Sequence, residues 1–288
     1  MASANEIRHR IAAVEQTRKI TGAMEMVSSN RMRRISSRKE YNRRYFDHIR
    51  RAMREILSSV KDLTHPYLTE RPEGRRTYIV ISGDKGLCGA YNAAVLALAD
   101  QRLAEYPDAT LITIGHVAEA YYRRKGRDPD ISMLGIVQDP TMKAARRISS
   151  EIMRLYDEGL TDEVHMVFTA FYDELKNKPF ECRILPLMED DYLDIEDEEF
   201  EETIYTPSPQ AVLNELVPQY ILGLLFGIMG QAYASEHYSR MTAMHASTQN
   251  AGDMLKALKT QYNLARQSAI TNEIAEITGA AEILKEIG

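Results

Sequence analysis

Residues 241–269, MTAMHASTQNAGDMLKALKTQYNLARQSA, carry the clearest periodicity in the chain. Apolar and small side chains recur there in alternating steps of three and four residues, at Met241, Met244, Thr248, Ala251, Leu255, Leu258, Tyr262, Ala265 and Ala269. This heptad seam predicts a helix that winds with a partner in a left-handed supercoil. The helical pattern begins at Ser208-Pro209, an N-cap followed by a first-turn proline, and Pro218 predicts a kink or break in it.

The N-terminal segment contains the expected partner helix. No proline occurs before Pro66, so a helix over residues 3–60 would be about 85 Å long. It carries a looser apolar stripe: Ile7, Ile11, Val14, Ile20, Met24, Val27 and Ile35. One helix leads into the middle of the chain and the other leads out, so the pair is expected to be antiparallel. The stripes also fit the core face of an ordinary helical bundle, but the length of both segments favours a projecting two-helix coil.

The middle of the chain alternates strand and helix patterns. Strands are predicted at Arg76–Ser82, Thr110–Gly115, Ile131–Val137, Val164–Ala170 and Phe180–Leu185, with helices at about 88–105, 116–126 and 141–158. This alternation indicates a largely parallel sheet covered by helices, closed by an antiparallel pair. The predicted fold class is therefore α/β: an antiparallel coiled coil of long N- and C-terminal helices plus a central Rossmann-like α/β domain. Its predicted parts are residues 1–60, 75–205 and 208–288, with the acidic run 189–202 as a connector.

The composition excludes several classes of protein. The chain has 288 residues, 44% of them hydrophobic and 27% charged, which is typical of a folded protein. Two cysteines give neither a disulfide framework nor a metal-binding spacing, and the seven histidines show no ligand spacing either. The charged N-terminus does not resemble a signal peptide, and the apolar stretch 220–230 is too short to span a bilayer.

A glycine-rich loop, SGDKGLCG at residues 82–89, is the most tempting chemical motif. It follows a strand and opens a helix, where a phosphate-binding loop would lie. However, it lacks the Gly-Lys-Ser/Thr ending of a P-loop and the three-glycine spacing of a dinucleotide site. A structural turn is the favoured interpretation, with Cys88 as a buried helix residue rather than a nucleophile. The sequence predicts no cofactor and no metal.

Charge is distributed unevenly along the chain. Residues 1–60 carry 14 Lys and Arg against 6 Asp and Glu, whereas residues 61–207 carry 17 against 29. The positive charge forms a basic sector, defined by Arg31, Arg33, Arg34, Arg38, Lys39, Arg43, Arg44, Arg50, Arg51 and Arg54. It could face acidic protein surfaces, bind nucleic acid or simply be solvated. No nucleic-acid recognition motif accompanies it.

Three stretches together resemble the gamma subunit of rotary ATP synthases. They are RHRIAAVEQTRKITGAMEMVSSNRMRR (residues 8–34), SGDKGLCGAYN (82–92), and EHYSRMTAMHASTQNAGD with YNLARQSAITNEIAEI (236–253 and 262–277). They occur in the order and spacing of that family, and the likeness covers the whole chain. Gly22 stands where the family pattern has lysine, and Glu25 adds a negative charge to the basic region. These differences concern details of one contact.

The resemblance implies a non-catalytic rotor shaft. In that family the terminal helices turn inside a hexamer of alpha and beta subunits, and the central domain contacts an epsilon subunit and the membrane c-ring. Ion flow turns the ring, and the shaft drives the catalytic sites through different conformations. The family match places Arg18, Lys19, Thr21 and Met24 near an acidic lever of a catalytic subunit. It also implies contacts of Arg266, Gln267, Thr271 and Glu273 with a loop of the hexamer. Partner contacts of Arg33 and Arg34 are expected from the basic sector, which would face acidic surfaces of the hexamer.

The resemblance further implies a peripheral protein on the cytoplasmic face of a bacterial plasma membrane. Two other classes of function stay open from the residues alone. A nucleotide-binding enzyme built on the central sheet would show micromolar affinity for ATP. A basic coiled-coil adaptor for nucleic acid would bind DNA with a steep salt dependence.

Overall fold

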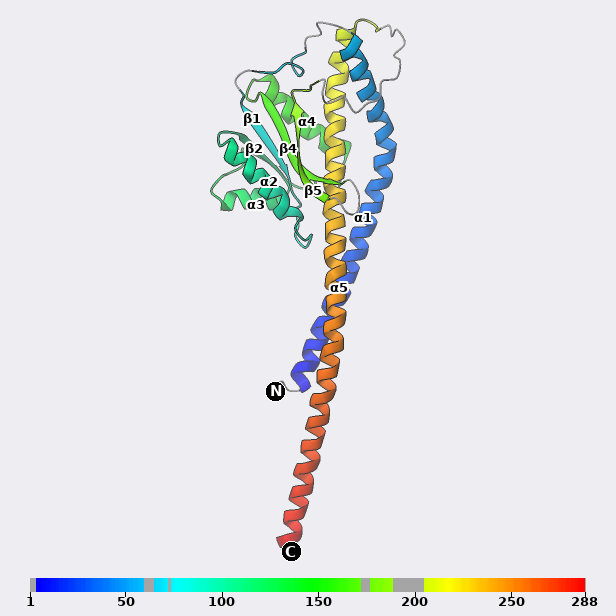
Figure 1. Cartoon of the computed structure of the whole chain (residues 1–288), viewed down its shortest axis with the longest axis vertical. Coiled ribbons are helices and arrows are strands. Elements are labelled where there is room, and N and C mark those ends of the chain that lie inside the picture. The colour runs from blue at the N-terminus through cyan, green and yellow to red at the C-terminus, as the bar shows by residue number, and fades with distance from the viewer. Residues whose placement is uncertain (1–3, 60–64, 72–73, 172–176, 189–204, 288) are drawn as a thin grey trace. The chain divides into compact units, whose positions relative to one another are not determined.

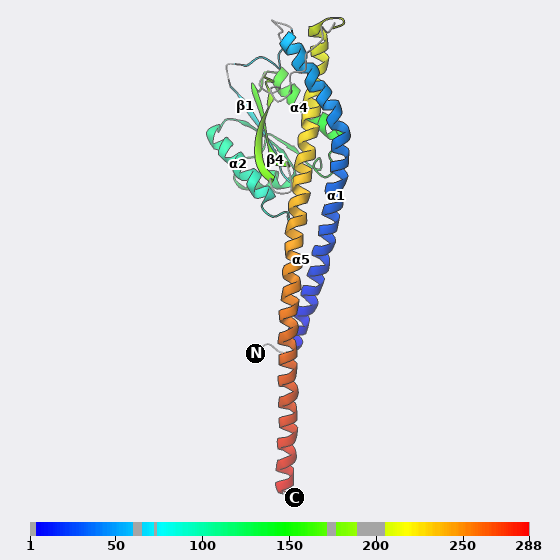
Figure 2. The same ribbon diagram turned by 45° about the vertical axis from the view of Figure 1, so that its right-hand side comes forward.

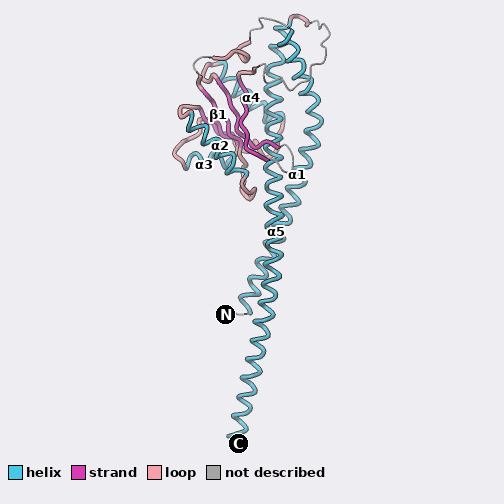
Figure 3. The backbone as a smooth tube through the Cα atoms, in the orientation of Figure 1, coloured by secondary structure: helices cyan, strands magenta, loops and turns pink. Residues whose placement is uncertain are grey.

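The computed structural model describes residues 4–59, 65–71, 74–171, 177–188 and 205–287, without the side chains of residues 36–45, 59 and 279–287. The acidic run 189–202 lies outside the described residues. The elements are, in chain order, α1 (Ala4–Ser59), β1 (Arg76–Ile81), α2 (Tyr91–Glu105), β2 (Thr110–Ile114), α3 (His116–Arg124), β3 (Ile131–Met133), α4 (Met142–Asp157), β4 (Glu163–Phe171), β5 (Asn177–Leu185) and α5 (Pro209–Ile287). Figures 1 and 3 show these elements, and they confirm the predicted α/β class with long terminal helices.

The chain forms two compact units. One consists of Met1–Val27 with Met241–Gly288 and is called the coil unit here; the other, Ser28–Arg240, is called the sheet unit. The boundaries fall inside α1 and α5, whereas the sequence predicted boundaries at the ends of these helices. The second half of α1 and the first part of α5 belong to the sheet unit because their apolar side chains share its core.

A five-stranded sheet organises the sheet unit, with strand order β3-β2-β1-β4-β5. The first four strands are parallel, and β5 is antiparallel to β4, as the sequence predicted. Ile79 in the central strand pairs with Ile112 on one side and with Met166 on the other. The chain therefore builds outward from β1 through β2 to β3 and returns to the opposite side of β1 with β4.

Two strands differ from their predicted limits. β3 ends at Met133 rather than Val137, because Gly135 takes a left-handed φ of 71° that an extended strand cannot accommodate. β5 begins at Asn177 rather than Phe180 and includes Pro179 opposite Thr169. Proline is tolerated there because β5 is an edge strand and needs no donor on its open side.

The two faces of the sheet carry separate cores. Tyr78, Val80 and Leu111 point to the face covered by α2 and α3. Ile79 and Ile112, one residue out of phase, point to the opposite face. α4, α1 and α5 supply the apolar side chains on that second face, and Figure 1 shows α2 and α3 on the other side of the strands. This alternation explains why the central strands read as continuous apolar runs.

The first part of α5 is a core helix of the sheet unit. Leu213, Val217, Ile221 and Leu225 are fully buried in its second core. Residues 209–278 are long and apolar enough by length and composition to cross a membrane, but the most apolar part of the stretch is this buried segment.

Of the kink or break predicted at Pro218, the break is wrong, since the helix continues through this residue. An interior proline costs a helix about 3 kcal/mol, and burial of the neighbouring Val217 and Ile221 offsets that cost. The N-cap prediction is confirmed, because the amide of Ala211 donates to Oγ of Ser208 at 3.2 Å.

The coil unit contains the predicted antiparallel pair, whose helices lie side by side in Figures 1 and 2. The α5 seam is confirmed over most of its length: Met244, Ala251, Leu255 and Leu258 are buried, and the other seam positions up to Ala265 are half-buried. The last one, Ala269, is exposed. Thr248 donates to Thr21 at 2.8 Å, which fixes the register of the two helices.

The predicted stripe on α1 is partly wrong. Ile7 is buried as expected, but Ile20 and Val27 are 52% and 51% exposed. Thr21 and Ser28, one position further along, are buried in their place. Strict heptad steps from Ile7 reach these two residues, so a 3.5-residue period sets the buried face rather than the apolar character of each side chain.

We predict that Gly223→Ala destabilises the protein. A Cβ there would lie 1.4 Å from Cε1 of Phe46, so the ring must move and the core must be overpacked. The expected cost is about 1–3 kcal/mol in the free energy of unfolding, measured with urea. The matched control is Gly227→Ala on the same helix, where a Cβ meets nothing within 4 Å. That variant should be neutral or gain up to about 1 kcal/mol, and equal effects at both positions would contradict the packing described here.

Candidate functional site

The ten predicted contact residues are placed mostly on open helix surface. Arg18, Lys19, Arg33, Arg34, Arg266, Gln267, Thr271 and Glu273 are exposed. Met24 is half-buried, and Thr21 is only 8% exposed. Because the Thr21 hydroxyl bonds to Thr248 inside the seam, it serves the coil itself. Of the remaining basic sector, the side chains of Arg38, Lys39, Arg43 and Arg44 lie outside the described residues.

Within the coil unit these residues form two separate patches. Thr21 pairs with Thr248, and Lys259 approaches Glu15 at 3.9 Å. In this antiparallel register Arg18 to Met24 lie opposite the middle of the α5 seam, while Arg266 to Glu273 lie near or beyond the level of Ala4. At 1.5 Å per residue the two patches are roughly 20–30 Å apart along the coil. They can contact two different partner surfaces at once.

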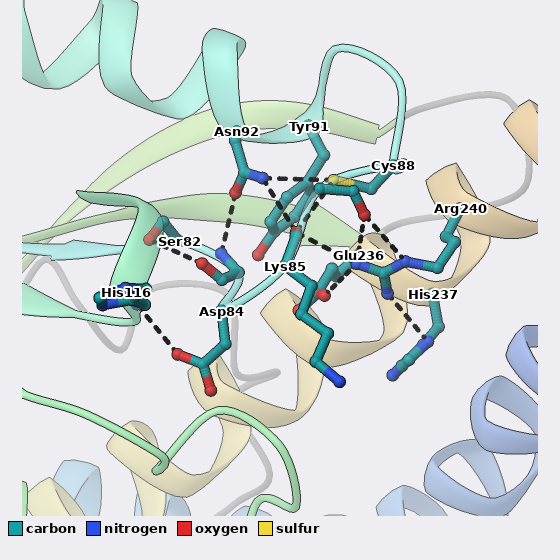
Figure 4. A network of polar contacts seen from close by, with 12 residues as sticks. Ser82, Asp84, Lys85, Cys88, Tyr91, Asn92, His116, Glu236, His237 and Arg240 are labelled. Atoms are coloured by element: carbon teal, nitrogen blue, oxygen red, sulfur yellow. Dashed lines mark hydrogen bonds and ion pairs between the residues drawn. The ribbon is translucent and has the colours of Figure 1, made fainter. Parts of the chain in front are cut away.

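The loop that follows β1, residues 82–90, takes part in a network of polar contacts in the sheet unit (Figure 4). It connects β1 to α2 at the carboxyl end of the parallel strands. The amide of Ala118 donates to Oγ of Ser82 at 2.9 Å, and the amide of His116 donates to Oδ1 of Asp84 at 2.9 Å. The amide of Gly83 donates to Oδ1 of Asn92, also at 2.9 Å. The polar groups of the loop are therefore hydrogen-bonded to α2 and α3 of the same chain.

Helix α5 closes the network from the other side. The Arg240 guanidinium donates to the carbonyl of Lys85 at 3.3 Å and to that of Gly86 at 3.2 Å. It also donates to Oε1 of Glu236 at 2.6 Å. Tyr91, the first residue of α2, donates from its hydroxyl to the carbonyl of Ala232 at 3.2 Å. These contacts join segments about 150 positions apart in the sequence.

Burial governs the electrostatics of this network. Glu236 and Arg240 are each 7% exposed and His237 is 4% exposed. Burial raises the pKa of Glu236, and the neighbouring Arg240 opposes that rise. Burial and the two cations Arg240 and Arg31 lower the pKa of His237 to about 3, so its imidazole is neutral at physiological pH. Burial also raises the pKa of the Cys88 thiol, which keeps it protonated. Cys88 is buried as the sequence predicted, but it lies in the loop before α2 and not in a helix.

Other kinds of site find little support in the described residues. Among them, no group of three or more His, Cys, Asp or Glu side chains could hold a metal ion. A hollow of about 180 Å³ is lined by Arg31, Arg34, Ile35, Gln138, Asp139 and Tyr233. Small-molecule pockets are usually about 300–1,000 Å³, so this hollow is too small for a nucleotide.

Sequence comparison assigns the chain to a family over its full length. The family described as ATP synthase matches residues 3–284. The ATP synthase gamma chain of Alkaliphilus metalliredigens is 37% identical over 283 residues, covering 97% of this chain and 98% of that one. The gamma chain of Heliobacterium modesticaldum is 33% identical over 289 residues, covering 99% and 100%.

The chain belongs to the ATP synthase gamma-chain family. Solved structures agree in fold at low sequence identity. A chain of the Euglena gracilis mitochondrial ATP synthase, from a structure titled OSCP/F1/c-ring, gives a TM-score of 0.67 at 14% identity, covering 98% of this chain and 94% of that one. A chain of the central stalk/c-ring of the Tetrahymena thermophila mitochondrial enzyme gives 0.58 at 20% identity, covering 79% and 98%.

The Glu236–Arg240 contact with the loop is the feature of this gamma-family chain that sequence reasoning missed. Both residues lie in a stretch that supports the family resemblance, but neither was predicted to hold another part of the chain. The available signal was their spacing of four residues, which places them on one face of a helix. That spacing gives no indication of the loop, because the loop is distant in the sequence.

We predict that His237 makes the stability of this gamma-family chain depend on pH. Its pKa is about 3 in the folded chain against an ordinary 6.5. Below pH 6.5 the unfolded chain therefore binds a proton that the folded chain does not bind. This contribution is fully present above pH 6.5 and falls, as the pH falls towards 3, by at most about 1.4 kcal/mol per pH unit.

His237→Asn tests this, since asparagine offers an acceptor but does not titrate. Urea unfolding of the full chain between about pH 5 and 7.5 should show a shallower loss of stability in the variant than in the wild type. Identical pH slopes in the two proteins would contradict the assignment.

Proposed function

We propose that this chain is the rotating central shaft, the gamma subunit, of a bacterial rotary ATP synthase. In this role it couples ion-driven rotation of a membrane ring to ATP synthesis or hydrolysis in a catalytic hexamer. The observation that carries the proposal is the full-length identity of 33–37% to bacterial ATP synthase gamma chains. The antiparallel coil supports it, because a shaft needs two helices joined along a continuous seam.

The partners follow from the same proposal. The alpha and beta subunits surround the coil unit, and an epsilon subunit and the c-ring contact the sheet unit. Chains of similar fold come from structures titled as a rotor and as a central stalk with its c-ring. The protein would then sit peripherally on the cytoplasmic face of the plasma membrane. Catalysis itself would belong to the hexamer, and this chain would be a non-catalytic subunit of an ATP-synthesising complex.

The surface of the coil unit supports an asymmetric shaft. α1 presents the cations Arg18 and Lys19 beside the exposed apolar Ile20, whereas the facing part of α5 carries Gln249 and Asp253, and Asp253 is paired with Lys256. A coil with unequal sides presents different chemistry to each of three otherwise identical catalytic sites as it turns. In the sheet unit, Arg31, Arg33 and Arg34 are exposed and can meet acidic surfaces of the hexamer. Each exposed ion pair would contribute only about 0–1 kcal/mol, so such contacts can form and break during rotation.

A nucleotide-binding role for the sheet is less well supported. The place where a doubly wound sheet binds phosphate is taken up by contacts between the loop after β1 and α5. A nucleic-acid adaptor has no specific observation in its favour beyond the basic charge.

The test of the proposed function is a reversible crosslink at Met24. A cysteine is introduced there and paired with a cysteine on the acidic lever of a catalytic subunit in the assembled complex. Oxidation should stop ATP turnover, because a pinned shaft cannot turn, and reduction should restore it. Oxidation of a complex that carries only the Met24→Cys change is the control and should retain activity. Full turnover with complete crosslinking would show that this contact does not slide during catalysis.

A further inference from the structure

The loop after β1 lies at the usual ligand position of this sheet topology. The strand order reverses between β1 and β4, and ligands of doubly wound sheets bind at the carboxyl ends of the strands at such a point. A phosphate there is normally held by a glycine-rich loop that opens a helix. In this chain the same kind of loop, residues 82–90, opens α2.

A carboxylate of the protein itself fills the space above this loop. A Cβ built on Gly83 would meet Cδ of Glu236 at 3.0 Å and Oε1 at 3.1 Å, so the carboxylate rests directly on the glycine. Arg240 then bridges from Glu236 to the carbonyls of Lys85 and Gly86, as Figure 4 shows. Both side chains are almost completely buried. A buried carboxylate with a guanidinium partner thus stands where another protein of this topology would bind an anion.

The loop is held in a conformation that it would not keep by itself. Leu87 has a left-handed φ of 61°, which is uncommon for a bulky residue, and its side chain is 63% exposed. Strained backbone of this kind persists only where the surroundings fix it. Leu87 directly follows the two residues whose carbonyls accept from Arg240. The Arg240 guanidinium is therefore well placed to keep Leu87 in this strained backbone conformation.

We infer that Glu236 and Arg240 form a latch that holds the loop 82–90 on α5, with the Glu236 carboxylate replacing a bound anion. They act as positioning residues: the latch makes the loop and its exposed tip a rigid part of α5. When the shaft turns under load, the tip therefore moves with the helix instead of yielding. The effect of the latch during rotation rests on the proposed function, whereas the contact of Glu236 and Arg240 with the loop does not.

An ordinary helix ion pair is the alternative to a latch. Arg154 on α4 and Glu158, the C-cap residue of that helix, have the same spacing of four residues and the same separation, 2.6 Å, but both are about half exposed. No contact of theirs in the described structure reaches a distant loop. Glu158→Ala is therefore a matched control for Glu236→Ala. The charge-swapped double variant Glu236→Arg/Arg240→Glu keeps an ion pair but places at position 240 a carboxylate that cannot donate to carbonyls.

The experiment compares these variants in the assembled ATP synthase. Hydrogen exchange read by mass spectrometry measures the opening of residues 83–89, and proton pumping per ATP hydrolysed measures coupling. Glu236→Ala, Arg240→Ala and the charge swap should each speed exchange of the loop roughly tenfold or more, since hydrogen bonds to a buried charge are lost. They should also lower pumping more than hydrolysis. Sodium formate is compared with sodium chloride at equal ionic strength. Formate should restore both readouts in Glu236→Ala, but in neither Arg240→Ala nor the charge swap.

The other possible outcomes decide against the latch or against its role in coupling. Loop exchange that is unchanged in Glu236→Ala, or that rises equally in Glu158→Ala, overturns the latch. Faster exchange with an unchanged pumping ratio overturns its role in coupling. If Glu236→Ala does not assemble, Glu236→Gln keeps the shape of the side chain without its charge, and the same readouts apply to it. A wild-type complex that fails to pump would count against the proposed function, while the exchange data would still test the latch.

Discussion

The burial of the first part of α5 in the core of the sheet unit is the constraint on which the rest of the structure depends. Leu213, Val217, Ile221 and Leu225 have no exposed surface there. Fully burying a side chain of this size contributes about 1.5–3 kcal/mol, so this segment cannot leave the sheet without large cost. It accounts for the most apolar stretch of the chain, for the helix that continues through Pro218, and for the close approach of Gly223 to Phe46. This part of the helix and the sheet therefore form one packed core.

The coil unit is stabilised by polar as well as apolar side chains at the seam between its two helices. Its seam contains Thr21 and Thr248 besides leucine, methionine and alanine. Buried hydroxyls are stable there only when they are hydrogen-bonded, and the contact between Thr21 and Thr248 meets that need. Polar seam positions fix the register of two helices better than a uniformly apolar seam would. A shaft with one defined register is what a torsional load requires.

Much of the architecture could be predicted from the sequence because it follows from local patterns. Alternation of strands and helices predicted the parallel sheet, and the heptad from Met241 predicted the α5 seam up to Ala265. The prediction of the buried stripe on α1 was wrong at Ile20 and Val27, because it followed large apolar side chains and not the strict heptad positions. The two compact units divide the long helices because the same helix is a core helix in one part and a coil in the other. The contact of Arg240 with Gly86 joins distant residues, and no local pattern encodes it.

The central claim is that the chain turns inside a catalytic complex, and direct observation of rotation tests it. A bead is attached to a cysteine introduced at the exposed Asp108, on the loop between α2 and β2, after Cys182 has been replaced, and the catalytic hexamer is fixed to a surface. The account predicts that the bead turns in one direction when ATP is supplied and stops when ATP is removed. ATP hydrolysis at an undiminished rate with a stationary bead would contradict it.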